Sequence, residues 1–125
     1  MRYLLDSHTL LWATSKSQLL SEPTRREIEA PQNIIFVSLV SLWELRLKES
    51  LGKLKILPGF YRQLTDTGYE LLTLSLAHIE TFGKLPWHHK DPFDRMLVAQ
   101  AMTEQFTLMT RDEEVMKYQV EILRS

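Results

Sequence analysis

The chain has 125 residues, of which 44% are hydrophobic and 25% are charged, as in an ordinary globular domain. This composition excludes a disordered chain, a collagen and a coiled coil. The absence of cysteine excludes a disulfide framework, a thiolate zinc site and a cysteine nucleophile, and nothing indicates an oxidising compartment. We therefore expect one domain over residues 1–125 that is held together by its hydrophobic core.

The charges are nearly balanced, with 15 Lys and Arg residues against 16 Asp and Glu residues and a net charge of −1. Nucleic-acid-binding domains usually carry a large basic excess, so a nucleic-acid site here has to be a local basic patch. No apolar run approaches the roughly 18 residues of a membrane span, and the first residues lack a secretory signal pattern. We expect a cytoplasmic protein without membrane contact.

Short apolar runs alternate with helical patterns along the whole chain. The expected strands cover residues 3–5, 34–37, 70–73, 107–109 and 120–123. The expected helices cover residues 9–13, 21–30, 39–51, 58–66, 75–84 and 92–104, with a further short helix from residue 112. This alternation favours right-handed βαβ crossovers around a central parallel sheet, and ligands bind such sheets at the carboxyl ends of the strands.

Two aspartates follow expected strands. Asp6 ends the first strand and Asp112 follows the strand at residues 107–109, so both are expected at the edge of the sheet where ligands bind. The alternative for each is a structural role as a helix cap or turn residue.

Glu44 is the most informative acidic residue. At about 100° per residue it falls within an apolar helical stripe formed by Val40, Trp43, Leu47 and Leu51. A buried carboxylate needs a cation, a metal ion or a proton as partner. An ion pair with Lys48, one turn further along, is the structural alternative.

Asp94 shares a helix face with Leu97 and Val98, which again indicates partial burial. Here capping is a stronger alternative, because Asp91 stands where a helix N-cap is expected and Asp94 falls where the acid of a capping box is found. We interpret Asp91 mainly as a cap, and Asp94 as a candidate site residue.

Four carboxylates converging on one cleft would repel one another unless a cation joined them. Mg²⁺ or Mn²⁺ prefers such oxygen ligands, whereas no zinc-type spacing of His or Cys exists. The adjacent His88 and His89 are expected as a surface loop pair. Basic residues gather after Glu44 and around Asp94, as a rim for a phosphodiester would, or as ordinary solvated charges: Arg46, Lys48, Lys53, Lys55, Lys84, His88, His89, Lys90 and Arg95.

Four segments together resemble the PIN-domain ribonucleases, and among them the VapC-type toxins of prokaryotic type II toxin–antitoxin systems. The segments are Leu4-Leu5-Asp6-Ser7-His8, Val37-Ser38 through Trp43-Glu44-Leu45 with Lys48, residues 91–101 (DPFDRMLVAQA), and Thr110-Arg111-Asp112. They span nearly the whole chain in the family's order. The resemblance implies a three-layer α/β/α fold with a central, mostly parallel sheet.

The resemblance also implies an endoribonuclease that depends on Mg²⁺ or Mn²⁺ and cleaves RNA by metal-activated water. Its metal-binding and catalytic residues would be Asp6, Glu44, Asp94 and Asp112, with Asp91 as a less secure ligand. Lys48, Arg95 and Thr110 are the expected substrate-binding residues, and the resemblance also implies that the Thr110 hydroxyl orients a carboxylate or a water. Ser7 replaces the Thr that is common after the first Asp in the family and keeps its hydroxyl. The implied partners are RNA, a cognate antitoxin and a second copy of the chain.

Two other classes compete with this interpretation. A receiver-type signalling domain also binds Mg²⁺ at its strand ends, but it needs an acid pair where Asp6-Ser7 stands and a Lys where Thr110-Arg111 stands. A PIN-like module that binds RNA or a protein without cleavage is the second alternative. Metal-dependent cleavage by the purified protein would exclude it.

Overall fold

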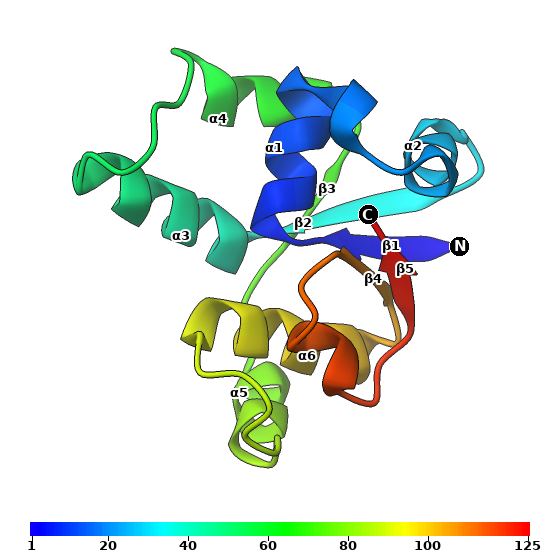
Figure 1. Ribbon diagram of the computed structural model, residues 1–125, viewed down its shortest axis with the longest axis vertical. Helices are drawn as coiled ribbons and strands as arrows, with labels where there is room; N and C mark the ends of the chain where they lie inside the picture. The colour runs from blue at the N-terminus through cyan, green and yellow to red at the C-terminus, as the bar shows by residue number, and fades with distance from the viewer.

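Five strands form one sheet in the order β3-β2-β1-β4-β5, and every neighbouring pair is parallel. The fold is that of a computed structural model, which describes all residues from 1 to 125 (Figure 1). The strands are β1 (Arg2–Leu5), β2 (Ile34–Ser38), β3 (Glu70–Leu72), β4 (Thr107–Thr110) and β5 (Ile122–Arg124). The predicted parallel sheet is confirmed, and all five strands lie within a few residues of their expected positions.

Six α-helices and three short 3₁₀ helices connect the strands. They are α1 (Ser7–Ser15), α2 (Glu22–Glu29), α3 (Leu39–Ser50), α4 (Phe60–Gln63), α5 (Leu76–Gly83), α6 (Pro92–Glu104), η1 (Ser17–Leu19), η2 (Leu64–Asp66) and η3 (Val115–Lys117). The expected helix over 58–66 is divided into α4 and η2, and the helix expected from residue 112 is reduced to η3. None of the helices has the length and apolar character needed to cross a membrane.

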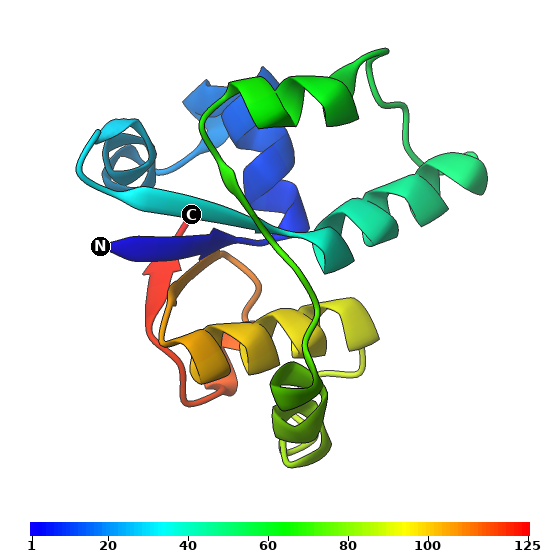
Figure 2. The same cartoon turned by 180° about the vertical axis from the view of Figure 1, so that it is seen from behind.

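The helices cover both faces of the sheet, which gives the expected three layers. α1, α2 and α4 lie over one face, and α5 and α6 lie over the other (Figures 1 and 2). Alternate strand residues enter two separate cores: Leu5 and Met109 pack on the α1 side, while Leu4 and Leu108 pack on the α6 side. The strands are therefore apolar on both faces, as sandwiched parallel strands must be.

The strand order changes direction at β1. The chain moves outward from β1 to β2 and β3, then returns to β4 and β5 on the opposite side of β1. Leu5 and Met109 are register partners near the carboxyl ends of β1 and β4. The segments that follow diverge, because α1 packs on one face and Val115 of η3 packs on the other. Such a switch point leaves a crevice at the carboxyl edge of the sheet.

The buried face of α3 differs from the expected one. Val40 and Glu44 are buried, but Trp43, Leu47 and Leu51 are exposed. The helix instead turns Ser41 and Leu45 inward together with Val40 and Glu44. The carboxylate is thus buried as predicted, within a face that is partly polar and partly apolar rather than within the expected apolar stripe.

Candidate functional site

The ends of β1 and β4 place Asp6 and Asp112 at the switch-point crevice. Asp6 caps α1, because its Oδ1 accepts a hydrogen bond from the Thr9 amide at 2.8 Å. Asp112 Oδ1 accepts hydrogen bonds from the amides of Glu114 (2.8 Å) and Val115 (3.1 Å). Each cap uses only one carboxylate oxygen and leaves Oδ2 for a second partner. The capping alternative and a ligand role therefore do not exclude each other.

Glu44 reaches the same crevice from the middle of α3 and is only 4% exposed. Its Oε1 accepts a hydrogen bond from Ser7 Oγ at 2.5 Å, and its Oε2 lies 3.0 Å from Lys48 Nζ. The Lys48 pair expected as the structural alternative is present. These two contacts explain how a buried carboxylate is tolerated, since an unpaired one would be strongly destabilising.

Asp91 and Asp94 lie at the N-terminus of α6. Asp91 Oδ1 accepts hydrogen bonds from the Phe93 and Asp94 amides, so Asp91 is the predicted N-cap. The capping box does not form, because the Asp91 amide donates to the ring of His89 instead of to Asp94. The Asp94 side chain is directed into the crevice, where it lies 3.1 Å from His89 Nε2.

Burial is the largest cause that raises the pKa of the Asp94 carboxyl, and together with the neighbouring carboxylates, in the order Asp91, Glu44, Asp6 and Asp112, it brings this pKa to about 7. The Asp94 carboxyl group is thus the one whose ionisation is most opposed by the site. Any cation that entered the crevice would favour the ionised form of the Asp94 carboxyl and lower its pKa.

These side chains line a cavity of about 240 Å³ that contains no hydrophobic residue. Its ten residues are Asp6, Ser7, His8, Glu44, Lys48, His89, Asp91, Asp94, Arg111 and Asp112. The structure therefore brings together all five acidic residues singled out in the sequence, and Lys48 with them. Five carboxylates face the two permanent cations of Lys48 and Arg111, which leaves the cavity strongly acidic.

The sequence interpretation gave His89 only as one of a surface loop pair or as part of a basic rim, whereas in the structure it lines the cavity among the carboxylates. Its Nε2 lies 3.1 Å from Asp94 Oδ2 and 3.3 Å from Asp112 Oδ2, so it is not a surface loop residue as expected. His88 alone is exposed, and its ring packs against that of Tyr118. The place of His89 in the sequence could have indicated this role. It precedes the N-cap Asp91 by two residues, and the chain must enter α6 at the crevice.

The whole arrangement was compared with known proteins. A family model for the PIN domain matches residues 3–120. The chain belongs to the PIN domain family. A search of curated proteins found no match.

Several solved structures share this PIN fold over nearly the full length of both chains. VapBC2 from Rickettsia felis, bound to a DNA fragment from its promoter, gives a TM-score of 0.74 at 20% identity, with 98% of each chain covered. VapBC-1 from nontypeable Haemophilus influenzae gives 0.67 at 14% identity, with 98% of this chain and 97% of that chain covered. The toxin–antitoxin protein VapBC-5 from Mycobacterium tuberculosis gives 0.64 at 18% identity, covering 99% and 98%.

Arg95 of this PIN domain does not reach the cavity, contrary to the expectation that it binds substrate. Its side chain is 2% exposed, and its guanidinium lies 3.8 Å from the ring centre of Trp87 and 4.9 Å from that of Phe82. Its Nη1 donates hydrogen bonds to the Pro86 carbonyl and to the Tyr118 hydroxyl. Arg95 therefore fastens the loop that precedes α6, and substrate cannot contact it in this conformation.

Thr110, the other expected substrate contact, is fully buried. Its Oγ1 accepts a hydrogen bond from the Asp112 amide at 3.1 Å. This contact orients the turn that carries Asp112 rather than presenting a hydroxyl to a ligand. Lys48 is the one predicted substrate-binding residue that lines the cavity.

Arg111 lines the cavity although the sequence interpretation gave it no role. Its guanidinium stacks 4.1 Å from the Trp12 ring centre and donates to the carbonyls of Leu19 and Ser125. These contacts hold a permanent positive charge at the edge of the acidic cavity. Its position directly before Asp112 in the sequence was the signal that could have identified it.

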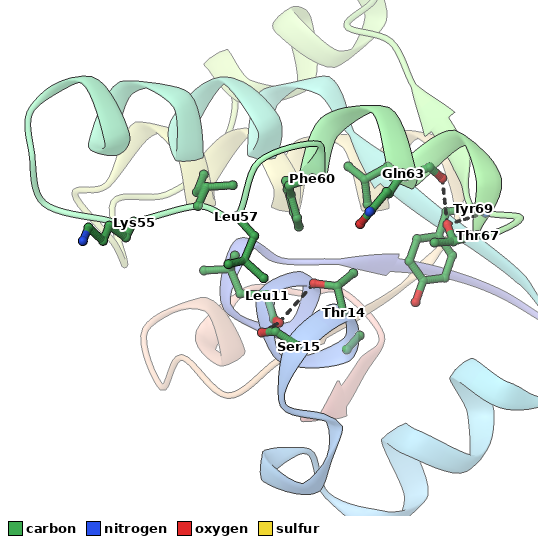
Figure 3. A pocket seen from close by; sticks show the side chains of 12 residues that line it. Leu11, Thr14, Ser15, Lys55, Leu57, Phe60, Gln63, Thr67 and Tyr69 are labelled. Carbon is green, nitrogen blue, oxygen red and sulfur yellow. Dashed lines mark hydrogen bonds between the residues drawn. The ribbon is translucent and has the colours of Figure 1, made fainter.

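A larger apolar pocket of about 300 Å³ lies between α1 and the segment that runs from Lys55 to Tyr69. Figure 3 shows Leu11 and Phe60 among the side chains that line it. It contains none of the acidic residues of the crevice. Its lining offers packing surface rather than groups for acid–base or metal chemistry, so the polar cavity is the candidate active site.

Proposed function

We propose that this protein is a metal-dependent endoribonuclease that acts as the toxin of a type II toxin–antitoxin pair. The observation that carries the proposal is the convergence of five carboxylates in one small polar cavity at the switch point of a PIN-family sheet. The toxin role is supported by the neighbours with the same fold, which are described as toxin–antitoxin complexes. We place the protein in the cytoplasm, where its RNA substrate would be.

The residues of the cavity fit a hard divalent cation. Asp6 and Asp112 keep Oδ2 free of capping bonds, and Asp94 and Glu44 supply further carboxylate oxygens. Oxygen donors of this kind suit Mg²⁺ or Mn²⁺, and the chain has no thiolate that would favour zinc. We propose Asp6, Glu44, Asp94 and Asp112 as the ligands, with Asp91 beside them as a cap that can add an oxygen.

The remaining cavity residues would bind and orient the RNA. A bound divalent ion supplies a water of lowered pKa and stabilises the charge that develops on the phosphate. Lys48 and Arg111 line the cavity and would hold the phosphodiester backbone at the edge of the acidic floor. Water attacks phosphorus as the bond to the 3′ oxygen breaks, which leaves 5′-phosphate and 3′-hydroxyl ends.

The partners follow from the same cavity and from the toxin role. A cognate antitoxin would inhibit the enzyme by placing a basic side chain among the carboxylates, where it would replace the cation electrostatically. Such a contact would block both the metal ligands and the path of the RNA. We propose a homodimer as the assembly of the toxin.

The test is an incubation of the purified protein with total cellular RNA and Mg²⁺, followed by sequencing of the new ends. We expect discrete cleavage that EDTA abolishes because it removes the ion, and that Asp6→Asn abolishes because it removes one carboxylate ligand. Asp66→Asn is the matched control, since Asp66 is exposed on η2 and does not line the cavity. A folded protein that binds Mn²⁺ but leaves all RNA intact would favour the binding module without cleavage.

A further inference from the structure

The ring of His89 has a fixed hydrogen-bonding state. Its Nδ1 lies 3.1 Å from the backbone nitrogen of Asp91, which can only donate a hydrogen bond. Nδ1 must therefore be the unprotonated acceptor nitrogen. In the neutral ring the proton is then on Nε2, the nitrogen that faces the cavity.

This proton forms a hydrogen bond with one of the proposed ligands, Asp112, and the nitrogen that carries it lies close to a second, Asp94. Nε2 donates to Asp112 Oδ2 at 3.3 Å and contacts Asp94 Oδ2 at 3.1 Å. Asp94 belongs to α6 and Asp112 to the turn after β4, so the ring links carboxylates that come from two separate elements. Without a donor between them, these carboxylates would repel each other.

The same three side chains have the spacing of a metal site, because their potential ligand atoms lie within 4.8 Å of one another. The hydrogen bond at Nδ1 decides against a ligand role for the ring. A metal-bound imidazole donates from its other nitrogen, usually to a carbonyl or a carboxylate. Here that other nitrogen accepts, so Nε2 carries a proton and has no lone pair for a metal ion.

The loop that carries His89 is anchored on its outer side. The His89 amide donates to the Tyr118 hydroxyl at 3.2 Å, and Arg95 Nη1 donates to the same hydroxyl at 3.0 Å. The His89 side chain is 17% exposed. Main chain and ring are thus both held by hydrogen bonds, and the donor is set in place before any ligand arrives.

We propose that His89 is a positioning residue that holds Asp112 and Asp94 in place for the divalent cation without binding the cation itself. The inference rests on the proposed function. Loss of a group that orients a metal ligand typically weakens metal binding about 10- to 100-fold. The donor at Nε2, rather than the bulk of the ring, should therefore set the affinity of the cavity for Mn²⁺.

Two substitutions of His89 distinguish the role of Nε2 from that of Nδ1. His89→Gln keeps a donor near the place of Nε2, and His89→Asn keeps an acceptor near the place of Nδ1 but loses the donor. His88→Asn is the matched control from the same loop, since His88 is exposed and does not line the cavity. Mn²⁺ binding to the full chain is measured by titration calorimetry, after thermal unfolding has shown that each variant folds.

We expect His89→Asn to bind Mn²⁺ about 10- to 100-fold more weakly, and His89→Gln and His88→Asn to bind it like the wild type. Nitrogen NMR of the metal-free protein should show the proton of His89 on Nε2. Pulsed electron paramagnetic resonance of bound Mn²⁺ should show the same nitrogen coupling in the wild type and in His89→Asn.

Three results would overturn the inference: unchanged Mn²⁺ affinity in His89→Asn, a proton on Nδ1, or a directly bound nitrogen whose signal disappears in His89→Asn. If such a result came from a protein that binds Mn²⁺ and cleaves RNA, the proposed function would stand. A folded wild-type protein that binds no Mn²⁺ would remove both the inference and the proposed metal site.

Discussion

Asp94 is the residue whose ionisation depends most on its surroundings, because burial and four nearby carboxylates raise its pKa to about 7. In the metal-free protein the folded state keeps this proton at a higher pH than the unfolded chain does. The resulting stabilisation is complete below the ordinary pKa of 3.8 and is lost as the pH rises to about 7.

The same proton should compete with the metal ion. We expect the affinity for Mn²⁺ to fall about tenfold for each pH unit below 7 and to level off above it, because one proton must leave before Asp94 can bind. Calorimetric titration between pH 5.5 and 8.5 measures this dependence. Asp94→Asn should remove it, and an affinity that stays constant down to pH 5.5 would contradict the prediction.

Ser7 supports Glu44 through a short, buried hydrogen bond. Ser7→Ala would remove a donor to a buried charge, and we expect it to lower the free energy of unfolding by about 1–3 kcal/mol. Urea denaturation measures the change. Ser15→Ala, at an exposed site on the same helix, is the control and should have almost no effect. Equal stability of the two variants would show that Glu44 does not need this donor.

At the scale of elements, the loop before α6 depends on one hydroxyl group. Tyr118 is 5% exposed, and its hydroxyl accepts hydrogen bonds from the His89 amide and the Arg95 side chain. Tyr118→Phe should destabilise the protein by about 1–3 kcal/mol, because it leaves buried donors without a partner. It should also speed hydrogen exchange at the His89 amide.

Tyr69→Phe is the matched control for this loop, since Tyr69 lines the apolar pocket and lies away from the residue 84–91 segment. Chemical denaturation and hydrogen exchange are compared for the two variants. If Tyr118→Phe and Tyr69→Phe behave alike, then the hydroxyl does not anchor the loop.

Some elements could be predicted because their signals are local. Helix α6 occupies the expected residues 92–104, since the N-cap Asp91 and Pro92 at the first helical position define its start. The strands could also be predicted, because short apolar runs between helical patterns leave few assignments other than a buried strand. Among the site residues, Asp6 and Asp112 could be placed at one sheet edge once the sheet was taken as parallel.

The features that could not be predicted depend on contacts between distant segments. The buried face of α3 makes contacts with distant segments, among them the hydrogen bond between Ser7 and Glu44, which lie 37 residues apart. The position of the Arg95 side chain away from the cavity depends on Tyr118 and on the aromatic rings around its guanidinium. His89 enters the cavity only because the loop turns inward, and neither periodicity nor charge pattern reports that turn.

For the molecule as a whole, repulsion among the carboxylates of the acidic cavity opposes folding, and a bound cation would relieve it. A divalent ion at about one hundred times its Kd should stabilise the protein by about 2.7 kcal/mol, which corresponds to a rise in Tm of roughly 10 °C. Thermal unfolding with and without Mn²⁺ measures this rise. EDTA should reverse it and Asp6→Asn should reduce it, whereas an unchanged Tm in the wild type would count against a metal site.

We propose that the carboxylates of this cavity carry out metal-dependent cleavage of RNA. The most direct test is the single-turnover cleavage rate of one mapped RNA site in Mg²⁺, measured for the wild type, Asp6→Asn and Asp66→Asn. We expect Asp66→Asn to keep the wild-type rate and Asp6→Asn to cleave at least about a hundredfold more slowly while remaining folded. Equal rates for Asp6→Asn and the wild type would show that cleavage takes place elsewhere.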